Sequence, residues 1–196
     1  AAQLVGPNLA VNNIKTNCKQ PGAGTAVKFH QDFAYEAHSN DDMVAVLVFV
    51  DDVTIHNGPL EIVTGTHRGP VFDHWQDGIF TGTIVDEDLA TVGAPVACHG
   101  PAGSACLMHT RLVHGSAANL TDQPRTLAIF SYRSEDSRIL HPNHIPSVHE
   151  GEVVRGSATG RIRASSYEMA LGEKPTTASF FDQQAQDPPQ EVGKPT

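Results

Sequence analysis

The sequence has few cysteines and no long apolar run, and both absences exclude classes of protein. The longest apolar run, residues 43–50, has eight residues, whereas a membrane-spanning helix needs about 20. We therefore expect no membrane segment, and because no basic region precedes an apolar stretch at the start, we expect no signal peptide. Cys18, Cys98 and Cys106 show no CxxC spacing, which favours a reducing compartment, the cytoplasm, over a disulfide scaffold.

Basic residues are scarce as well. The chain carries 13 Lys and Arg against 22 Asp and Glu, a net charge of −9, without a basic cluster. This balance argues against a nucleic-acid partner and against an anionic membrane surface. The apolar fraction of 39% is ordinary for a globular domain. The 11 histidines are many for 196 residues, and they prompt a search for metal ligands.

Frequent glycine and proline, 17 and 13 residues, divide the chain into short segments that favour strands over long helices. The predicted strands are residues 9–16, 25–33, 43–50, 60–64, 95–99, 104–109, 112–116 and 126–133. Short helices are predicted at residues 86–90 and 165–171, and residues 65–93 form a long excursion. Such a pattern predicts an antiparallel sandwich or barrel. We expect one domain over residues 1–181, followed by a polar, Pro-rich tail over residues 182–196.

The triplet His30-Gln31-Asp32 is the first candidate metal site. On a strand, His30 and Asp32 point to the same face, where an imidazole and a carboxylate can bind one ion. Taken alone, the triplet is more readily explained as a polar strand face. A third ligand from His114 completes two histidines and one carboxylate, a set typical of non-haem Fe(II) oxygenases, whereas structural zinc is closed by four ligands. His109 is the alternative third ligand, but it lacks the Gly-Ser-x-x-Asn context that follows His114.

Arg125 follows His114 by eleven residues. A turn between them would place both residues on neighbouring antiparallel strands, where an arginine can bind a carboxylate through two parallel hydrogen bonds. In isolation Arg125 is as readily a surface residue at the start of a strand. Together with the three candidate ligands, it favours a dicarboxylic cosubstrate that binds the metal at one end and Arg125 at the other.

Three stretches, HQDF from residue 30, NGPLEIVTGTHRG from residue 57 and HGSAANLTDQPR from residue 114, resemble the phytanoyl-CoA dioxygenase family of Fe(II)/2-oxoglutarate-dependent oxygenases. The resemblance covers residues 11–133. It implies an all-β double-stranded β-helix, a cupin-like jelly roll with a few short helices and long loops. It also implies that His30, Asp32 and His114 bind iron, and that Arg125, assisted by Ser116, binds the distal carboxylate of 2-oxoglutarate. The sequence departs from the family at residues 64–67, where TGTH replaces the usual PGSH.

The resemblance implies a dioxygenase that uses Fe(II), 2-oxoglutarate and dioxygen to hydroxylate a small organic molecule, with release of succinate and CO2. The related halogenases have a small residue in place of the carboxylate, so the presence of Asp32 favours hydroxylation or desaturation. Lys28 lies on the His30 face of the predicted strand and is a candidate anion contact, or else a solvated side chain. Family members usually carry a longer N-terminal portion, and only 29 residues precede His30. Two alternatives stay open: the sequence is a piece of a longer protein, or it is a minimal member in which the domain of residues 1–181 lacks that portion.

Candidate substrate contacts are Phe33, Tyr35, Trp75 and Arg133, although Phe33 is equally suited to the core. A loose histidine cluster comprises His141, His144 and His149. Pro142 and Pro146 argue against the helix that a zinc site there would need. Two other functions remain open: a non-catalytic, cupin-like relative that binds a metal or ligand, and another metal-dependent enzyme on the same fold, such as an isomerase or hydrolase.

Overall fold

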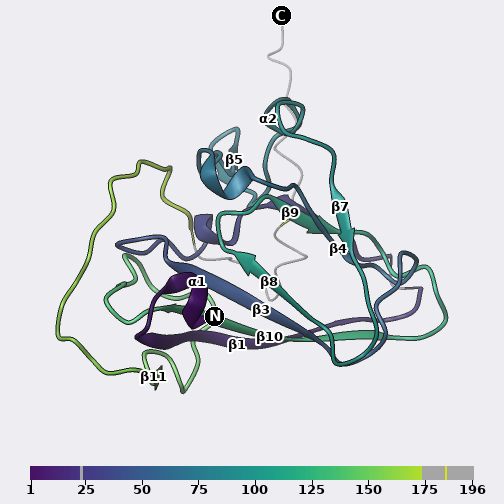
Figure 1. Cartoon of the computed structure of the whole chain (residues 1–196). Coiled ribbons are helices and arrows are strands. Elements are labelled where there is room, and N and C mark those ends of the chain that lie inside the picture. The colour runs from purple at the N-terminus through teal and green to yellow at the C-terminus, as the bar shows by residue number, and fades with distance from the viewer. Residues whose placement is uncertain (23, 174–183, 185–196) are drawn as a thin grey trace, which may run out of the picture.

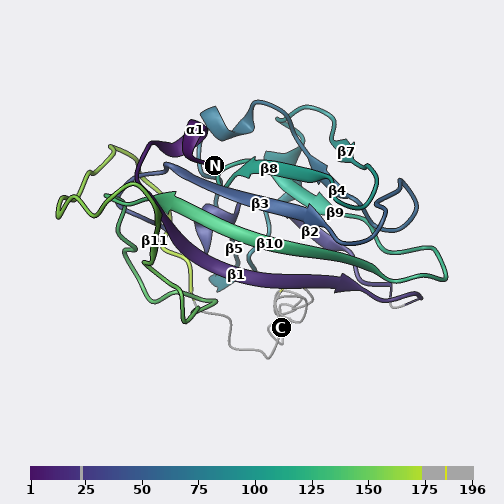
Figure 2. The same cartoon turned by 60° about the horizontal axis from the view of Figure 1, so that its bottom comes forward.

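Two antiparallel sheets face each other in this structure, a computed structural model that describes residues 1–22, 24–173 and 184 (Figures 1 and 2). The larger sheet has five strands. In spatial order they are β11 (Val153–Arg155), β1 (Leu9–Lys19), β10 (Arg125–Ser134), β3 (Met43–Phe49) and β8 (Ala105–His109). The two longest strands, β1 and β10, pair with each other in this sheet.

The smaller sheet has four strands and lies opposite the larger one. Its strands are β2 (Val27–His30), β9 (His114–Ser116), β4 (Leu60–Ile62) and β7 (Val96–Cys98). A separate hairpin pairs β5 (Trp75–Gln76) with β6 (Ile79–Phe80). The helices are α1 (Ala2–Val5), α2 (Asp86–Leu89) and the 3-10 turns η1 (Asp32–Ala34) and η2 (Thr66–Arg68). The expected all-β core with a few short helices is confirmed.

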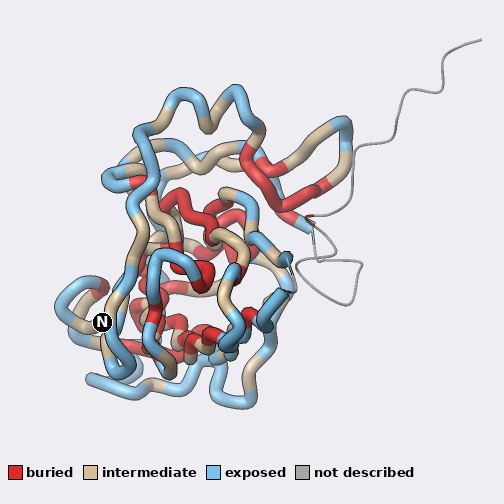
Figure 3. Tube along the Cα trace, turned by 90° about the vertical axis from the view of Figure 1, so that its right-hand side faces the viewer, coloured by how far each residue is buried: buried red, intermediate tan, exposed pale blue. Residues whose placement is uncertain are grey.

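Apolar side chains from both sheets form the main core cluster, and Figure 3 shows that the buried residues lie along the interior of the trace. The members of this core are Ala45, Leu47, Phe49, Val53, Leu60, Met108, Leu112, Leu127 and Ile129. In β10 the alternation of buried and half-buried residues turns every second side chain inward. This alternation determines which residues of β10 face the space between the sheets.

All eight predicted strands are present, with shifted ends. The first runs three residues further than expected, to Lys19, and the second ends at His30, three residues early. The hairpin β5–β6 lies inside the stretch that was predicted to be a long excursion, and β11 and α1 were not predicted. The predicted helix over residues 86–90 is confirmed by α2. Among the described residues, no helix has the length and apolar character that crossing a membrane requires.

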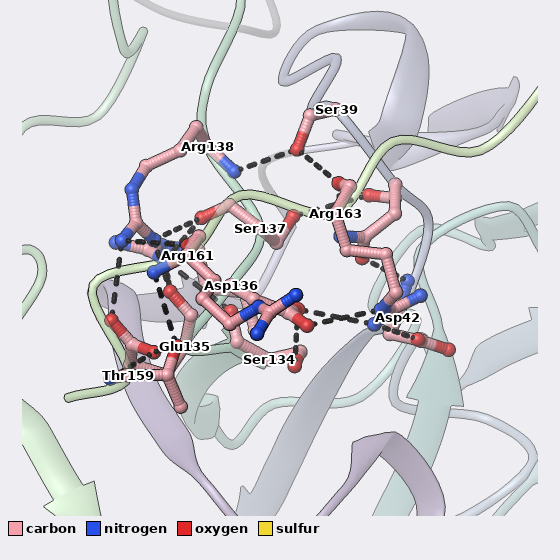
Figure 4. Close-up of polar contacts among 12 residues, drawn as sticks. Ser39, Asp42, Ser134, Glu135, Asp136, Ser137, Arg138, Thr159, Arg161 and Arg163 are labelled. Atoms are coloured by element: carbon pink, nitrogen blue, oxygen red, sulfur yellow. Dashed lines mark hydrogen bonds and ion pairs between the residues drawn. The ribbon is translucent and has the colours of Figure 1, made fainter. Parts of the chain in front are cut away.

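Residues 156–173, which we name the C-terminal strap, run along the outside of the barrel and are fastened by ion pairs (Figure 4). Arg163 donates from Nε to the Asp136 carboxylate at 3.0 Å, and its guanidinium also pairs with Asp42. Glu135 accepts hydrogen bonds from the N–H and the hydroxyl of Thr159 in the strap. Half-exposed ion pairs contribute little energy individually, so their main effect is to fix where the strap lies.

The predicted helix over residues 165–171 is wrong, because the strap is extended there. Its polar groups bond to the barrel instead of to one another: the Ser165 N–H donates to the Ser39 carbonyl at 2.8 Å, and the Tyr167 hydroxyl donates to the His38 carbonyl. The predicted tail, residues 182–196, lies outside the described residues except for Gln184. That residue is buried, and its side-chain carbonyl accepts a hydrogen bond from the Lys28 N–H.

His74 joins the long loop of residues 65–93 to the strand that carries the first candidate ligand. Its Nδ1 lies 2.8 Å from the Phe72 carbonyl, and its Nε2 accepts a hydrogen bond from the Gln31 N–H at 3.0 Å. This pattern assigns the proton to Nδ1. Burial lowers the pKa of His74 from 6.5 to about 4, so the ring is neutral at pH 7 and holds the loop through both nitrogens.

We expect His74 to make stability depend on pH in the metal-free protein. A group whose pKa is lower in the folded state stabilises the fold above pH 6.5, and this contribution is lost as the pH falls toward about 4. The effect is at most about 3 kcal/mol for one histidine. The unfolding free energy, measured by urea titration at several pH values between 4 and 7, should change less steeply with pH for His74→Gln than for wild type. The exposed His56→Gln is the control, and equal slopes for the two variants would contradict the assignment.

Candidate metal centre

The candidate ligands come from the ends of two paired strands in the smaller sheet. His30 ends β2, His114 begins β9, and the two residues are direct cross-strand partners. Asp32 was expected on the same strand as His30, but the strand ends first and Asp32 begins η1. The extended backbone of Gln31 (φ −122°, ψ 125°) keeps the carboxylate on the His30 side. His30 and Asp32 therefore point to the same side, as predicted, but because Gln31 is extended and not because Asp32 belongs to the strand.

The three side chains converge on one point. Asp32 Oδ1 lies 3.5 Å from His30 Nε2 and 3.7 Å from His114 Nε2. All three potential ligand atoms lie within 4.8 Å of one another. A metal ion held at about 2.1 Å from each nitrogen fits separations of this size with small adjustments. Both imidazoles are buried and the carboxylate is largely buried, so the three side chains are shielded from bulk solvent.

Backbone carbonyls orient both imidazole rings. His30 Nδ1 lies 2.9 Å from the Lys28 carbonyl, and His114 Nδ1 lies 2.9 Å from the Leu112 carbonyl. These contacts place the ring proton on Nδ1, so Nε2 is the nitrogen that faces Asp32, as in metal-ligating histidines. Burial, reinforced by the charge of His30, lowers the pKa of His114 to about 4. His114 is therefore neutral at pH 7, the form that binds a metal.

The charge on Asp32 is stabilised by its surroundings. Burial alone would raise its pKa, but the positive charge of Lys15 and the two imidazoles outweigh burial and hold the pKa below its usual value. Lys15 lies on β1, in the opposite sheet, and lines the same cavity. This electrostatic effect could not be predicted from the sequence, because it depends on how the two sheets face each other.

Gln31, the residue between the ligands, is fully buried and fixed by its side chain. Its Nε2 donates to the carbonyls of Pro70 and Arg111 at 3.0 and 2.7 Å, and its Oε1 accepts from the Phe72 N–H at 2.8 Å. Together with the bond from its own N–H to His74, these contacts hold the backbone on both sides of the site. The side chain of Gln31 thus positions two ligands without facing the metal.

Arg125 lies at the far end of the cavity, on the larger sheet. It was expected on a strand next to that of His114, but β9 and β10 belong to different sheets, so Arg125 faces the site across the barrel. Its Nη1 donates to Asn17 Oδ1 at 3.1 Å and its Nη2 to the Gly58 carbonyl at 2.6 Å. Its Nε is buried without a partner among the described residues. Burial lowers the pKa of Arg125 to about 10, so it stays charged at pH 7.

Lys19 is a second buried cation at this end. Its Nζ donates to the Ser116 carbonyl at 3.3 Å and to the Ala117 carbonyl. Burial, and then the charge of Arg125, lower the pKa of Lys19 to about 8. Gly58 makes this packing possible, since its φ is +77° and an added Cβ would lie 2.8 Å from the Lys19 side chain. Lys19 and Arg125 make this end of the cavity electropositive in a chain that is acidic overall.

A cavity of about 330 Å³ connects the candidate ligands with Arg125. Its polar lining includes the three candidate ligands, Lys15, Thr16, Asn17, Ser116 and Arg125. Its apolar lining includes Val27, Ala45, Leu47, Leu60, Met108, Leu127, Ile129 and Ile145. The volume suits small molecules, and the charged end is separated from the ligand end by apolar wall.

The remaining predicted site residues lie in different places. Ser116 lines the cavity beside Arg125, whereas Lys28 is exposed and is not part of the lining. The four predicted substrate contacts are also absent from the lining of this cavity. Phe33 is fully buried in the core, and Tyr35 donates its hydroxyl to the Gly82 carbonyl at 2.7 Å.

The other two predicted substrate contacts bond to backbone carbonyls. Trp75 donates from Nε1 to the Leu171 carbonyl of the C-terminal strap at 3.0 Å. Arg133 is half-buried and donates to three carbonyls, among them that of Ser137 at 2.5 Å. Their assignment as substrate contacts stays a prediction.

Other histidines lie apart from the site. His109, the alternative third ligand, accepts a hydrogen bond from the Arg111 N–H at 3.1 Å and packs against His67. In the loose cluster, the rings of His141 and His144 are 5.3 Å apart, while His149 pairs with Glu152. Among the described residues, only His30, Asp32 and His114 form a group of three potential ligands.

Comparisons with known proteins agree with this geometry. Residues 1–127 match the family model described as phytanoyl-CoA dioxygenase (PhyH). The chain is 33% identical over 140 residues to a probable alpha-ketoglutarate-dependent hypophosphite dioxygenase of Stutzerimonas stutzeri, covering 68% of this chain and 48% of that protein. It is 31% identical over 167 residues to L-proline trans-4-hydroxylase of Streptomyces griseoviridis, covering 74% and 62%. The chain thus spans about half to three fifths of the length of these relatives.

Solved structures show the same fold. The apo form of the non-heme monooxygenase ThoJ superposes with a TM-score of 0.66 at 26% identity, covering 94% of this chain and 64% of that chain. EctD from S. alaskensis, solved with 2-oxoglutarate and 5-hydroxyectoine, superposes with a TM-score of 0.63 at 24% identity, covering 83% and 58%. The second likeness, at this identity, speaks for the fold alone.

We expect Gln31→Ala to loosen the site without removing a ligand. The change deletes three side-chain hydrogen bonds and leaves two partly buried carbonyls and one N–H without these partners, which costs about 2–4 kcal/mol of unfolding free energy. Binding of Co(II), followed by calorimetry, should weaken about 10–100-fold. The exposed Gln20→Ala is the matched control and should change neither quantity. Unchanged metal affinity in Gln31→Ala would show that the ligands hold their own positions.

Proposed function

The chain belongs to the phytanoyl-CoA dioxygenase family, and we propose that it is the catalytic core of an Fe(II)/2-oxoglutarate-dependent dioxygenase that hydroxylates a small organic molecule. One observation carries the proposal: two histidines and one carboxylate converge at one end of a cavity, and a buried arginine, whose Nε has no partner among the described residues, lies at the other. The relatives named above are a dioxygenase and a hydroxylase of small molecules.

The donor set fits Fe(II). Two neutral imidazole nitrogens and one carboxylate oxygen are the combination typical of non-haem Fe(II) oxygenases, and none of the three cysteines belongs to the group. His30, Asp32 and His114 would hold the ion, and all three line the cavity in which further ligands could bind. When bound there, Fe(II) with 2-oxoglutarate and dioxygen supplies the oxidising chemistry and yields succinate and CO2.

Arg125 is suited to the distal carboxylate of 2-oxoglutarate. Its guanidinium is held by Asn17 and the Gly58 carbonyl, so little side-chain freedom is lost when a carboxylate binds. Its buried Nε offers a donor that no described residue uses. Ser116 lines the cavity at the same end and adds a hydroxyl. Apolar wall between this end and the ligands suits the methylene carbons of the cosubstrate and keeps water out.

The activity is tested without knowledge of the substrate. The protein loaded with Fe(II) and 2-oxoglutarate under argon should show the visible charge-transfer absorption of the chelate, and in air it should slowly release succinate. His114→Ala removes one of three ligands, so we expect at least a 100-fold loss of iron affinity and no absorption band. A wild-type protein that binds Fe(II) but never forms the band with 2-oxoglutarate would refute the proposed function.

Arg125→Ala separates the cosubstrate from the metal. We expect the Kd for 2-oxoglutarate, measured by titration of the absorption band under argon, to rise about 100-fold or more because a buried charge-assisted contact is lost. The Kd for Fe(II) alone should change less than threefold, since Arg125 lies at the opposite end of the cavity. Arg155→Ala, on the exposed strand β11, is the control. An unchanged Kd for 2-oxoglutarate would remove Arg125 from this role.

A further inference from the structure

A second group of buried polar side chains lies beside the metal centre, and the proposed function does not use it. We name Asn12, Asn13, Glu36, His38 and Ser131 the acceptor cluster; all five are buried. The Nδ2 atoms of Asn12 and Asn13 both donate to Glu36 Oε2, at 2.5 and 3.0 Å. Two amides on a single carboxylate oxygen fix the side chain of Glu36 and leave its second oxygen, Oε1, for another donor.

A β-bulge in β1 builds the cluster. The register between β1 and β10 shifts between Val11 and Asn13, so Asn12 is an extra residue in the ladder. Without the bulge, consecutive residues would point to opposite faces of the sheet. A bulge turns an extra side chain to the same side, and here both asparagines reach the same carboxylate. Such irregularities are common next to active sites.

The cluster continues the wall of the cavity. Along the inner face of β10, Arg125, Leu127 and Ile129 line the cavity, and Ser131 is the next inward residue. Ser131 pairs with Asn13 on one side and with Ala45, itself part of the lining, on the other. The acceptor cluster therefore lies one step beyond the cavity, at the end opposite Arg125.

The facing sheet runs in the same direction, from the Arg125 end to the metal. Ser116 lies near Arg125, His114 follows, and Asp32 lies beyond. The charge of Asp32 acts on Glu36: burial first, and then this charge, raise the pKa of Glu36 to about 8. With 2-oxoglutarate between the metal and Arg125, the cluster lies on the side of the metal that is left for a substrate.

The unpartnered atoms of the cluster are mainly hydrogen-bond acceptors. Asn12 Oδ1 and Asn13 Oδ1 are buried without partners among the described residues, as is Ser131 Oγ. His38 Nδ1 lies 2.5 Å from the Glu36 carbonyl and so carries the ring proton, which leaves the buried, unpartnered Nε2 as an acceptor. No ion pair joins Glu36 to a cation in the described part of the chain; Lys15 acts on it only at a distance. Buried acceptors of this kind call for a ligand that donates hydrogen bonds.

We infer that the acceptor cluster binds a positively charged nitrogen of the substrate, an ammonium or a protonated cyclic amine, through Glu36. An ammonium offers two or three N–H donors on a compact charge, matching the Glu36 carboxylate and the two asparagine oxygens. Its charge would favour the ionised form of Glu36, which burial and the charge of Asp32 disfavour and with which no cation forms an ion pair among the described residues. This inference rests on the proposed function and narrows its substrate class from small organic molecules to small amines and amino acids.

The experiment measures binding under argon to the full chain loaded with Fe(II) and 2-oxoglutarate. The probes are pairs with one carbon skeleton, with and without a cationic nitrogen: cyclopentylamine against cyclopentanol, and pyrrolidine-2-carboxylate against cyclopentanecarboxylate. Calorimetry should give at least tenfold tighter binding for the amine of at least one pair. Glu36→Gln keeps the shape and one acceptor but removes the charge, and should abolish that preference while the neutral partner binds as before. If no amine exceeds its neutral partner, or if Glu36→Gln weakens both members equally, the inference is wrong.

Two controls keep the outcomes separate. Glu87→Gln makes the same chemical change at an exposed position on α2 and should leave every affinity unchanged. The charge-transfer absorption of each protein is recorded before any probe is added. If wild type lacks the absorption band, the proposed function fails; if it has the band but shows no amine preference, only the present inference fails. Should Glu36→Gln lack the band, Asn13→Ala takes its place, with a smaller but selective loss of amine affinity expected.

Discussion

The pairing of His30 with His114 between β2 and β9 is the contact on which the site depends. Backbone hydrogen bonds between these strands bring together two imidazoles that are 84 residues apart in sequence. The carbonyls that orient both rings belong to residues two positions earlier on the same segments. A shift of this register by one residue would turn one histidine away from the cavity. Metal binding is therefore a property of the sheet as much as of the ligands.

Along the cavity, side chains of different character follow one another from the Arg125 end to the metal centre and beyond it. Arg125 and Lys19 form a cationic end, apolar residues of β3 and β10 follow, and the carboxylate of Glu36 lies past the metal. If both proposals hold, these two ends would separate a dicarboxylate from an amine by charge. Each small molecule would then be disfavoured at the place of the other.

Residues whose roles depend on short motifs could be predicted from the sequence, and residues whose roles depend on distant contacts could not. HQD and the HGS stretch predicted the converging group because donor type and spacing are local properties. Arg125 was predicted to lie on a strand next to that of His114, and this was wrong because residues 119–124 cross between the sheets instead of forming a hairpin. Glu36 and Asn12 were missed, since their contact spans 24 residues and needs a bulge that no pattern announces. The helix expected over residues 165–171 failed because that segment finds its hydrogen-bond partners on the barrel.

The extra residue in β1 also separates two regions of the strand. Downstream of Asn13 the ladder with β10 is regular to Lys19, so losing the extra residue would leave Asn17 and Lys19 beside Arg125 while one amide left the interior. Gain or loss of one residue at this position would therefore alter the pair of amides around Glu36 and leave the strand beside Arg125 in register.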